Sequence, residues 1–423
     1  MAHPAGTVGQ LKLAASAMLR SALFASLTAA LCTAVPAGAM SGHPPVRQQA
    51  PPAASAPSLE PEVLLVKTLL AIKNNQVDAA LSEVEKVLRA YPNFRLAHLI
   101  KGDLLLARGQ PLKMMGGATG APLERLADLR QEARARLARY QQERPVDRVP
   151  RNLLQLQPEQ KYALIVDTSK STLYVFENHN GTARYLTDYY ISSGKNGIDK
   201  VREGDKKTPL GVYHVTSSMP REKLADLYGV GAFPINYPNE WDRREGRKGG
   251  GIWLHGTPSD TFSRPPQASD GCVVLTNRDL EAIRQRVQIG LTPVIISNSV
   301  EWVQPQAVAA LRQELTGMLE QWRRDWESLN TERYLTHYGT SFRSGKQDYR
   351  AFVQQKKQVN AGKQWVKVKV DKVSIFLYPG KERLAVVTFD QDYTSSNTAN
   401  KMRKRQYWNK EGSTWKIIHE GAA

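Results

Sequence analysis

The stretch of residues 250–277 constrains the fold more than any other part of the sequence. Two short apolar runs, at 252–254 and 273–275, flank a segment rich in Ser, Pro and Asp. Runs of this kind are typical of buried strands, and the segment between them is typical of a loop. His255 follows the first run and Cys272 precedes the second. Two strands at these positions would bring an imidazole and a thiol together at the rim of a sheet.

The apolar periodicity changes along the chain and predicts a multidomain fold. Apolar residues recur at helical spacing over residues 58–145, which predicts a small α-helical N-terminal domain with a tetratricopeptide-like pattern. Only about one and a half repeats are visible, so the alternatives are a packing or dimerisation domain and a longer solenoid. Short strands with turn-rich connections predict a mainly-β domain over residues 158–298, including a hairpin at Asn180-Gly181. Residues 299–320 are expected to form a linker helix, and residues 321–423 an α+β cone.

The N-terminus has the features of a secretory signal peptide. Lys12 and Arg20 precede a nearly continuous apolar run, and Ala37-Gly38-Ala39 supplies a small-x-small cleavage site. We therefore expect residues 1–39 to be removed and residues 40–57 to form a flexible linker. The alternative is a retained transmembrane anchor, which the shortness of the run disfavours. The expected location of the mature protein is the periplasm.

The charge of the chain limits its partners. The formal net charge is +18, which suits nucleic acid or another anionic surface. Export argues against nucleic acid and favours a negatively charged cell envelope, while a solvated basic surface is the simpler alternative. The histidines show no metal-ligand spacing, and no Gly-Lys-Ser/Thr follows the glycines before residue 252. We expect no metal and no cofactor.

Cys272 and His255 are the predicted catalytic pair. Of two cysteines, Cys32 lies in the predicted signal peptide, so Cys272 would be the single thiol of the exported protein. A thiolate attacks a carbonyl, and an imidazole can take the thiol proton and return it to the leaving amine. The Gly256 carbonyl is the candidate partner that orients the imidazole. The backbone N–H groups of Gly271 and Cys272 are candidate oxyanion donors. The alternative is an inert buried cysteine.

Ser269 and Asp270 precede the predicted nucleophile and are candidate substrate contacts. Each has an alternative role in shaping the turn before Cys272. If the imidazole ionises the sulfur before substrate arrives, the thiol pKa should be low, and alkylation at neutral pH should be fast.

These residues resemble the L,D-transpeptidase (YkuD) family. Its motif is a histidine, a spacer, then Ser/Thr-His-Gly-Cys and an apolar residue, and this sequence matches with His255 and with Ser269, Gly271 and Cys272. The segments "ISSGKNG", "KTPLGVYHV" and "LTNRDLEAI" also resemble the family. The resemblance implies Cys272 as nucleophile and His255 as general base and acid. Two positions depart from the pattern, because Asp270 replaces the usual second histidine and Val274 a frequent arginine, which leaves acceptor specificity open.

The C-terminal region resembles a nuclear-transport-factor-like (SnoaL-like) domain. A YkuD domain followed by such a domain is similar to exported L,D-carboxypeptidases that trim tetrapeptide stems and control helical cell shape. The resemblance therefore implies peptidoglycan stem peptides as substrate and a Cys thioester intermediate in cell wall remodelling. The alternatives are transpeptidation, hydrolysis by an L,D-carboxypeptidase, and a non-catalytic envelope scaffold. A homodimer through the helical or the C-terminal domain is a further expectation.

Overall fold

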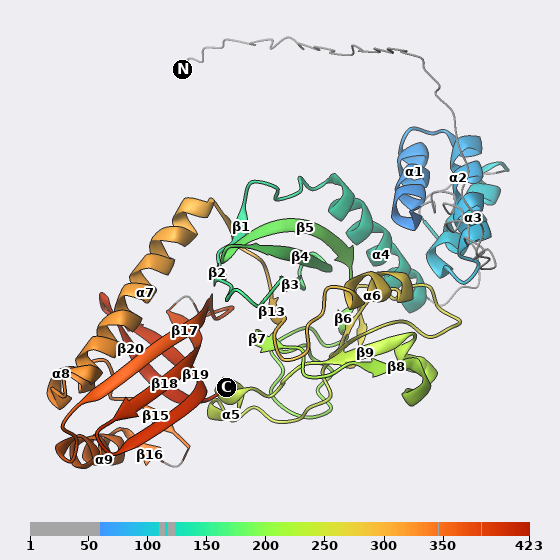
Figure 1. Ribbon diagram of the computed structural model, residues 1–423. Helices are drawn as coiled ribbons and strands as arrows, with labels where there is room; N and C mark the ends of the chain where they lie inside the picture. The colour runs from blue at the N-terminus through green and yellow to red at the C-terminus, as the bar shows by residue number, and fades with distance from the viewer. Residues whose placement is uncertain (1–59, 110–114, 117–122, 346, 382) are drawn as a thin grey trace, which may run out of the picture. The chain divides into compact units, whose positions relative to one another are not determined.

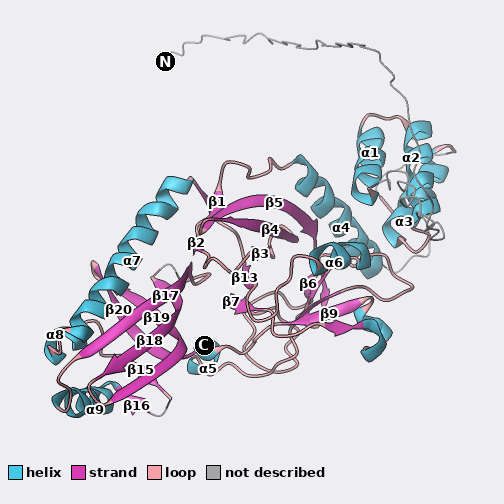
Figure 2. Cartoon of the chain, viewed as in Figure 1, coloured by secondary structure: helices cyan, strands magenta, loops and turns pink. Residues whose placement is uncertain are grey.

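The structure is a computed structural model that describes residues 60–109, 115–116, 123–345, 347–381 and 383–423. These residues belong to one compact unit, Ser58–Ala423 (Figure 1). The predicted signal peptide and linker lie outside the described residues. Within the described part of the chain, no helix is both long enough and apolar enough to cross a bilayer. Figure 2 shows helices at the start of this unit, a strand-rich middle, and helices packed with long strands at its end.

The N-terminal part is helical, as the periodicity predicts. It comprises α1 (Pro61–Lys73), α2 (Val77–Ala90), α3 (Arg95–Ala107) and α4 (Leu123–Gln141). A proline opens α1, where its missing N–H costs nothing. Asn75 adopts a positive φ of 56° and lets the chain reverse before α2. The apolar stripes of α1, α2 and α3 meet in one core. We call α1 to α4 the helical domain.

The middle of the chain contains two main sheets. The first has the order β5-β4-β3-β13-β7, from β3 (Tyr162–Asp167), β4 (Thr172–His179), β5 (Thr182–Tyr190), β7 (Gly211–His214) and β13 (Pro293–Ser297). The second has the order β12-β10-β9-β8, from β8 (Met219–Pro220), β9 (Gly231–Pro234), β10 (Trp253–His255) and β12 (Val273–Val274). The predicted hairpin is confirmed, because Asn180 and Gly181 take positive φ of 53° and 86° between β4 and β5.

Shorter elements complete the middle domain. They are β6 (Ser193–Gly194), paired with β11 (Gln267–Ser269), the 3₁₀ turns Arg221–Lys223 and Asp226–Tyr228, and the helices α5 (Glu240–Arg244) and α6 (Asn277–Arg284). An apolar core that includes Leu254, Val273 and Leu280 joins the two main sheets.

The C-terminal part is an α+β domain, as predicted. Its sheet runs β2-β17-β18-β19-β20, with β17 (Val366–Leu377), β18 (Leu384–Ser395), β19 (Thr398–Glu411) and β20 (Thr414–Ala422). The helices are α7 (Pro305–Glu327), α8 (Thr331–Leu335) and α9 (Tyr349–Ala361), with a small ladder of β15 (Arg343–Ser344) and β16 (Gln347–Asp348). Helix α7 lies along this sheet (Figure 1). Its Leu315, Leu319 and Trp322 belong to the core that the helix shares with the sheet.

Two boundaries differ from the sequence expectation. The expected limit at residue 320 falls inside α7, because one apolar face runs from Val308 to Trp326 and packs on a single core. The residues between the helical and middle domains form two short strands. Strand β2 (Leu153–Gln155) pairs with β17 and so belongs to the C-terminal sheet. Strand β1 (Val149–Pro150) pairs with β14 (Trp302–Val303).

A polar network fills the inside of the C-terminal domain. The Trp322 indole donates to the Tyr338 hydroxyl at 3.1 Å, and the hydroxyls of Tyr334 and Tyr338 are 2.6 Å apart. Tyr338 and Gln406 both donate to the Glu420 carboxylate, at 3.2 Å and 3.0 Å. The ammonium of Lys404, itself 6% exposed, lies 3.6 Å from the same carboxylate. The buried groups of this network thus satisfy one another.

Candidate active site

The pairing of β10 with β12 brings His255 and Cys272 together. The two strands are parallel, with Leu254 opposite Val273 and His255 opposite Val274. Because side chains alternate along a strand, Leu254 and Val273 enter the core, and His255 lies on the other face. Cys272 immediately precedes β12, and the same alternation places it on the face of His255. The predicted strand-loop-strand arrangement is therefore confirmed.

His255 is held in one tautomer by the following residue. Its Nδ1 lies 2.7 Å from the carbonyl oxygen of Gly256, the partner that the sequence suggested. A carbonyl can only accept, so Nδ1 carries the proton and Nε2 keeps its lone pair. The ring is 3% exposed, and burial lowers the pKa of His255 to about 4, although the bond to Gly256 favours the protonated ring. At neutral pH the imidazole is uncharged and competent as a base.

The Cys272 thiol is protonated in the resting site. Its Sγ donates to the Gly251 carbonyl at 3.4 Å. Burial raises the pKa of the Cys272 thiol above its ordinary value, and the Trp253 backbone and the Arg264 guanidinium offset part of that rise. This differs from the expectation of a low pKa. A partly buried sulfur beside an uncharged imidazole lacks a full positive charge to stabilise its thiolate.

Ser269 shapes the turn before the nucleophile. Its hydroxyl donates to the Cys272 carbonyl at 2.6 Å and accepts from the Gly271 N–H at 3.1 Å. The Gly271 N–H is thus committed to the turn, and the Cys272 N–H is the remaining backbone candidate for an oxyanion donor. Gly271 has a φ of 122°, and a Cβ there would lie 2.7 Å from the Lys207 carbonyl oxygen, so the turn requires glycine.

Asp270 points to solvent. Its side chain is 83% exposed, and its carboxylate lies 3.7 Å from the Lys206 ammonium. The loop 192–197 also contacts this turn, because the Lys195 N–H donates to the Ser269 carbonyl at 2.7 Å. Of the two predicted substrate contacts, Ser269 is therefore buried in the turn and Asp270 lies at the rim.

Sequence reasoning missed Asn277, which fixes the segment after His255. Its side-chain oxygen accepts from the N–H groups of Val230 and Thr257, each at 3.1 Å, and its amide donates to the Thr257 carbonyl at 2.9 Å. A Cβ on Gly256 would lie 2.1 Å from the Asn277 Oδ1, so this position also requires glycine. In the sequence, an Asn at the start of α6 resembles an ordinary helix-start residue. Its hydrogen bonds to Val230 and Thr257 become apparent only in the folded structure.

Two aromatic residues border the site. Tyr228 packs edge-on against His255 with ring centroids 5.1 Å apart, and contacts Trp253 at 4.7 Å. Trp253 lies two residues before His255, so strand alternation could have identified it as a neighbour. No group of three or more His, Cys, Asp or Glu side chains with metal-binding geometry occurs among the described residues.

Comparisons with known proteins identify two of the domains. The sequence model of the L,D-transpeptidase catalytic domain (YkuD) matches residues 161–296, and that of the Cds6 C-terminal NTF2-like domain matches residues 314–421. Bd1075 of Bdellovibrio bacteriovorus is 31% identical, with a TM-score of 0.58, over 66% of this chain and 98% of that chain. The chain belongs to the L,D-transpeptidase (YkuD) family and carries a C-terminal NTF2-like domain.

A second solved structure extends the similarity. The helical cell shape determining protein Pgp2 of Campylobacter jejuni is 27% identical, with a TM-score of 0.55, over 64% of this chain and 95% of that chain. A comparison with curated protein sequences found no match. The family and the domain order that the motifs implied are thus confirmed.

Proposed function

We propose that this protein is a periplasmic cysteine enzyme that acts on peptidoglycan stem peptides through a thioester at Cys272. The observation that supports it most is the hydrogen bond between His255 and Gly256, on a strand paired in parallel with β12. This bond leaves the lone pair of Nε2 unused, and strand alternation gives His255 and Cys272 the same face. The YkuD match and the similarity to a cell shape determining protein support the substrate class.

In the first half of the reaction, the Cys272 sulfur attacks the carbonyl that links the stem to its terminal D-amino acid. His255 Nε2 takes the thiol proton as the carbon–sulfur bond forms. The Cys272 N–H donates to the developing oxyanion, a contact typically worth about 3–4 kcal/mol. The carbon–nitrogen bond then breaks, and the imidazolium returns its proton to the departing amine, leaving a thioester.

In the second half, a nucleophile attacks the thioester while His255 takes its proton and passes it to the leaving sulfur. Water gives a trimmed stem, which is L,D-carboxypeptidation. The amine of another stem gives a cross-link, which is L,D-transpeptidation. Both outcomes use the same residues and differ only in the molecule that reaches the thioester.

The test is incubation of the exported form of the protein with purified muropeptides, followed by mass spectrometry of the products. Tripeptides with released D-amino acid indicate hydrolysis, and dimers or exchanged D-amino acids indicate transfer. Cys272→Ala should yield none of these and form no covalent adduct. Wild-type protein that gives no product and no adduct would overturn the proposal and favour the scaffold alternative.

A further inference from the structure

Helix α5 and the residues after it connect the C-terminal domain to the active site. The helix lies against the C-terminal sheet (Figure 1), and residues 246–251 follow it directly and lead to β10. Four of these six residues are glycine, and we call them the glycine segment. The last of them, Gly251, provides the carbonyl that accepts from the Cys272 Sγ at 3.4 Å. The position of that carbonyl therefore depends on what holds the glycine segment.

The apolar side of α5 packs on one face of the C-terminal sheet. Trp241 is 6% exposed and stacks on Tyr407 of β19, with ring centroids 5.5 Å apart and an angle of 25° between the planes. Trp408, next to Tyr407, belongs instead to the core between the sheet and α7. Because side chains alternate along a strand, Trp241 packs on the opposite face from that core. The contact is thus on the other side of the sheet from the polar network around Glu420.

Polar groups fix both ends of the same helix. At its start, the Arg405 guanidinium of β19 donates to both carboxylate oxygens of Glu240 at 3.0 Å. At its end, the Arg244 guanidinium donates to two backbone carbonyls of the C-terminal domain, at 2.9 Å and 2.7 Å. Hydrogen bonds from a charged donor are stronger than neutral ones and have defined geometry. Together with the stacked rings, they give α5 one orientation on the C-terminal domain.

The cap at the end of α5 fixes the start of the glycine segment. Gly246 has a φ of 72°, and its N–H donates to the Arg243 carbonyl at 3.1 Å. The Arg247 N–H donates to the Asp242 carbonyl at 2.8 Å. This is the Schellman arrangement, in which the two residues after a helix are bonded back to its last turn. The chain therefore leaves α5 in a direction that the orientation of the helix sets.

The catalytic domain holds the rest of the glycine segment at its two ends. The Lys248 N–H donates to a backbone carbonyl of the loop 199–206 at 2.9 Å, and the Ile252 carbonyl accepts from the N–H that follows β9 at 3.1 Å. Between these bonds the segment is open, because a Cβ built on Gly250 or Gly251 would meet no described atom within 4 Å beyond its chain neighbours. Glycines in open space can rotate about φ and ψ at little cost. The Gly251 carbonyl thus keeps its place only while both ends are held.

We propose that the C-terminal domain positions the catalytic thiol: its sheet fixes α5, α5 fixes the glycine segment, and the Gly251 carbonyl holds the Cys272 Sγ–H. The inference rests on the proposed function for the role of Cys272 as nucleophile. Trp241, Glu240 and Arg244 are positioning residues, because they act through the glycine segment. Releasing the segment exposes the sulfur to small reagents but removes the contact that orients it for attack on a substrate.

The first experiment measures alkylation of Cys272 by iodoacetamide between about pH 6 and pH 10, by mass spectrometry of the Cys272 peptide. Trp241→Ala should lower the pH midpoint by about one unit and raise the rate at neutral pH about 10-fold, since each unit multiplies the thiolate fraction about 10-fold. The reason is that the Gly251 carbonyl accepts only from the neutral thiol, and that a released segment admits water to a sulfur whose pKa burial raises. Trp241→Phe, which keeps a ring on Tyr407, should change both quantities less.

An unchanged midpoint in Trp241→Ala, with a circular dichroism spectrum of a folded chain, would overturn the proposal. The measurement needs no substrate, so it decides the proposal even if the proposed function fails.

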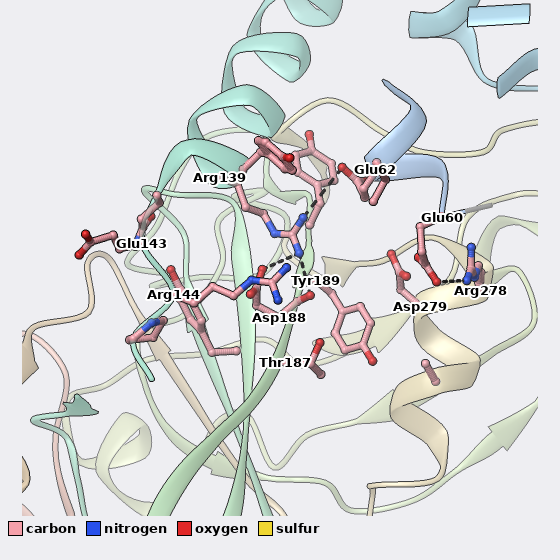
Figure 3. Close-up of a pocket in the computed structure, with 17 residues that line it drawn as sticks. Glu60, Glu62, Arg139, Glu143, Arg144, Thr187, Asp188, Tyr189, Arg278 and Asp279 are labelled. Atoms are coloured by element: carbon pink, nitrogen blue, oxygen red, sulfur yellow. Dashed lines mark hydrogen bonds and ion pairs between the residues drawn. The ribbon is translucent and has the colours of Figure 1, made fainter. Parts of the chain in front are cut away.

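Arg139→Ala is the matched control, because it breaks a contact between domains at another place. Figure 3 shows Arg139 of α4 with Glu62 and Asp188, whose carboxylates lie 3.9 Å and 2.5 Å from its guanidinium. These residues line a cavity of about 390 Å³ that neither member of the proposed catalytic pair lines. Arg139→Ala should leave the rate and the midpoint of alkylation unchanged. Equal shifts in Arg139→Ala and Trp241→Ala would mean that any loss of stability exposes the thiol, and the proposal would be wrong.

The second experiment removes the same contact from the C-terminal domain. Tyr407→Ala deletes the ring on which Trp241 stacks, and the double variant should alkylate no faster than either single variant, because both changes remove one contact. Arg244→Ala leaves no cavity in the aromatic cluster and should raise the rate severalfold, so it decides the question if the other variants do not fold. Wild-type rates in both Tyr407→Ala and Arg244→Ala would show that α5 holds the segment without the C-terminal domain, which would overturn the proposal.

The third experiment uses the substrate. With a tetrapeptide stem, Trp241→Ala should lower kcat about 10-fold and change KM by less than about 2-fold, because the glycine segment orients the sulfur rather than the substrate. Slower turnover together with faster alkylation is the result expected of a mispositioned nucleophile. A rise in KM with unchanged kcat would show that the segment binds substrate instead, and would overturn the proposal.

Discussion

The active site and the interior of the C-terminal domain both bury polar groups, but they pair them differently. In the C-terminal domain, Glu420 receives Tyr338, Gln406 and Lys404, so the charge and its neighbours satisfy one another. In the active site, His255 makes its hydrogen bond with the backbone at Nδ1, and the other ring nitrogen stays available. A fully paired network stabilises the fold, whereas an incompletely paired group is free to react.

The largest expected effect is the loss of turnover when the Cys272 sulfur is removed. Cys272→Ala should lower turnover by about 10⁴-fold or more, the scale for losing a nucleophile. Its unfolding free energy should change by less than about 1 kcal/mol, because the thiol makes a single long hydrogen bond. Product mass spectrometry and chemical denaturation measure the two quantities. Appreciable turnover by Cys272→Ala would show that Cys272 is not the nucleophile, and the active site would then no longer differ from the C-terminal interior in reactivity.

The C-terminal domain should show the opposite behaviour. Glu420→Ala leaves Lys404 buried without its carboxylate and should cost about 3–5 kcal/mol of unfolding free energy. Alkylation of Cys272 by iodoacetamide should be unchanged at a temperature where the variant is folded. Glu420→Gln, which keeps an acceptor for Tyr338, should cost less. A large loss of Cys272 reactivity in folded Glu420→Ala would show that the two regions are coupled.

A pair of asparagines separates positioning from stability. Asn277→Ala removes three hydrogen bonds next to His255 and should reduce kcat by about 10–100-fold. Asn178 makes an equivalent set of three, to Gln157, Gln160 and Gly181, away from the site. Asn178→Ala should therefore lose similar stability but keep kcat. Equal kcat in the two variants would mean that Asn277 only stabilises the fold.

Sequence predicted the parts of the molecule that depend on local patterns. His255 and Cys272 stand at fixed offsets from short apolar runs, so the two strands that carry the proposed catalytic pair could be predicted. The predicted domain limit at residue 320 lies within α7, because an amphipathic helix gives no sign of which core it enters. Asn277 was missed for a related reason. Its hydrogen bonds cross from one element to another, and the periodicity of the sequence does not record such contacts.

The raised pKa of the Cys272 thiol could not be predicted either. A histidine near a cysteine suggests an ion pair, and the sign of the shift depends on burial. His255 is almost fully enclosed, and the thiol donates to the Gly251 carbonyl, so both groups favour their neutral forms. The distinction matters for kinetics, because a neutral pair must transfer its proton during attack, whereas an ion pair already holds the nucleophilic thiolate.

The smallest expected effect is on the acid limb of the pH profile. An ordinary histidine, with a pKa of about 6.5, would be about 90% protonated at pH 5.5, and the rate would fall about 10-fold from its value at pH 7.5. Because the pKa of His255 is about 4, kcat/KM should change by less than about 2-fold over that interval and fall only near pH 4. A limb near pH 6.5 would show that the imidazole is solvated in the working enzyme.

The same shift sets the direction of the stability change. The unfolded chain binds a proton on this imidazole below about pH 6.5, whereas the folded chain does not until about pH 4. The contribution of His255 to the unfolding free energy is thus present above pH 6.5 and is lost as the pH falls toward 4. His255→Gln should remove that part of the pH dependence, as measured by denaturant unfolding at pH 7.5 and 5.0. Identical pH dependence in wild type and His255→Gln would mean that burial of the ring does not depress its pKa, and the contrast with the fully paired C-terminal interior would then rest on geometry alone.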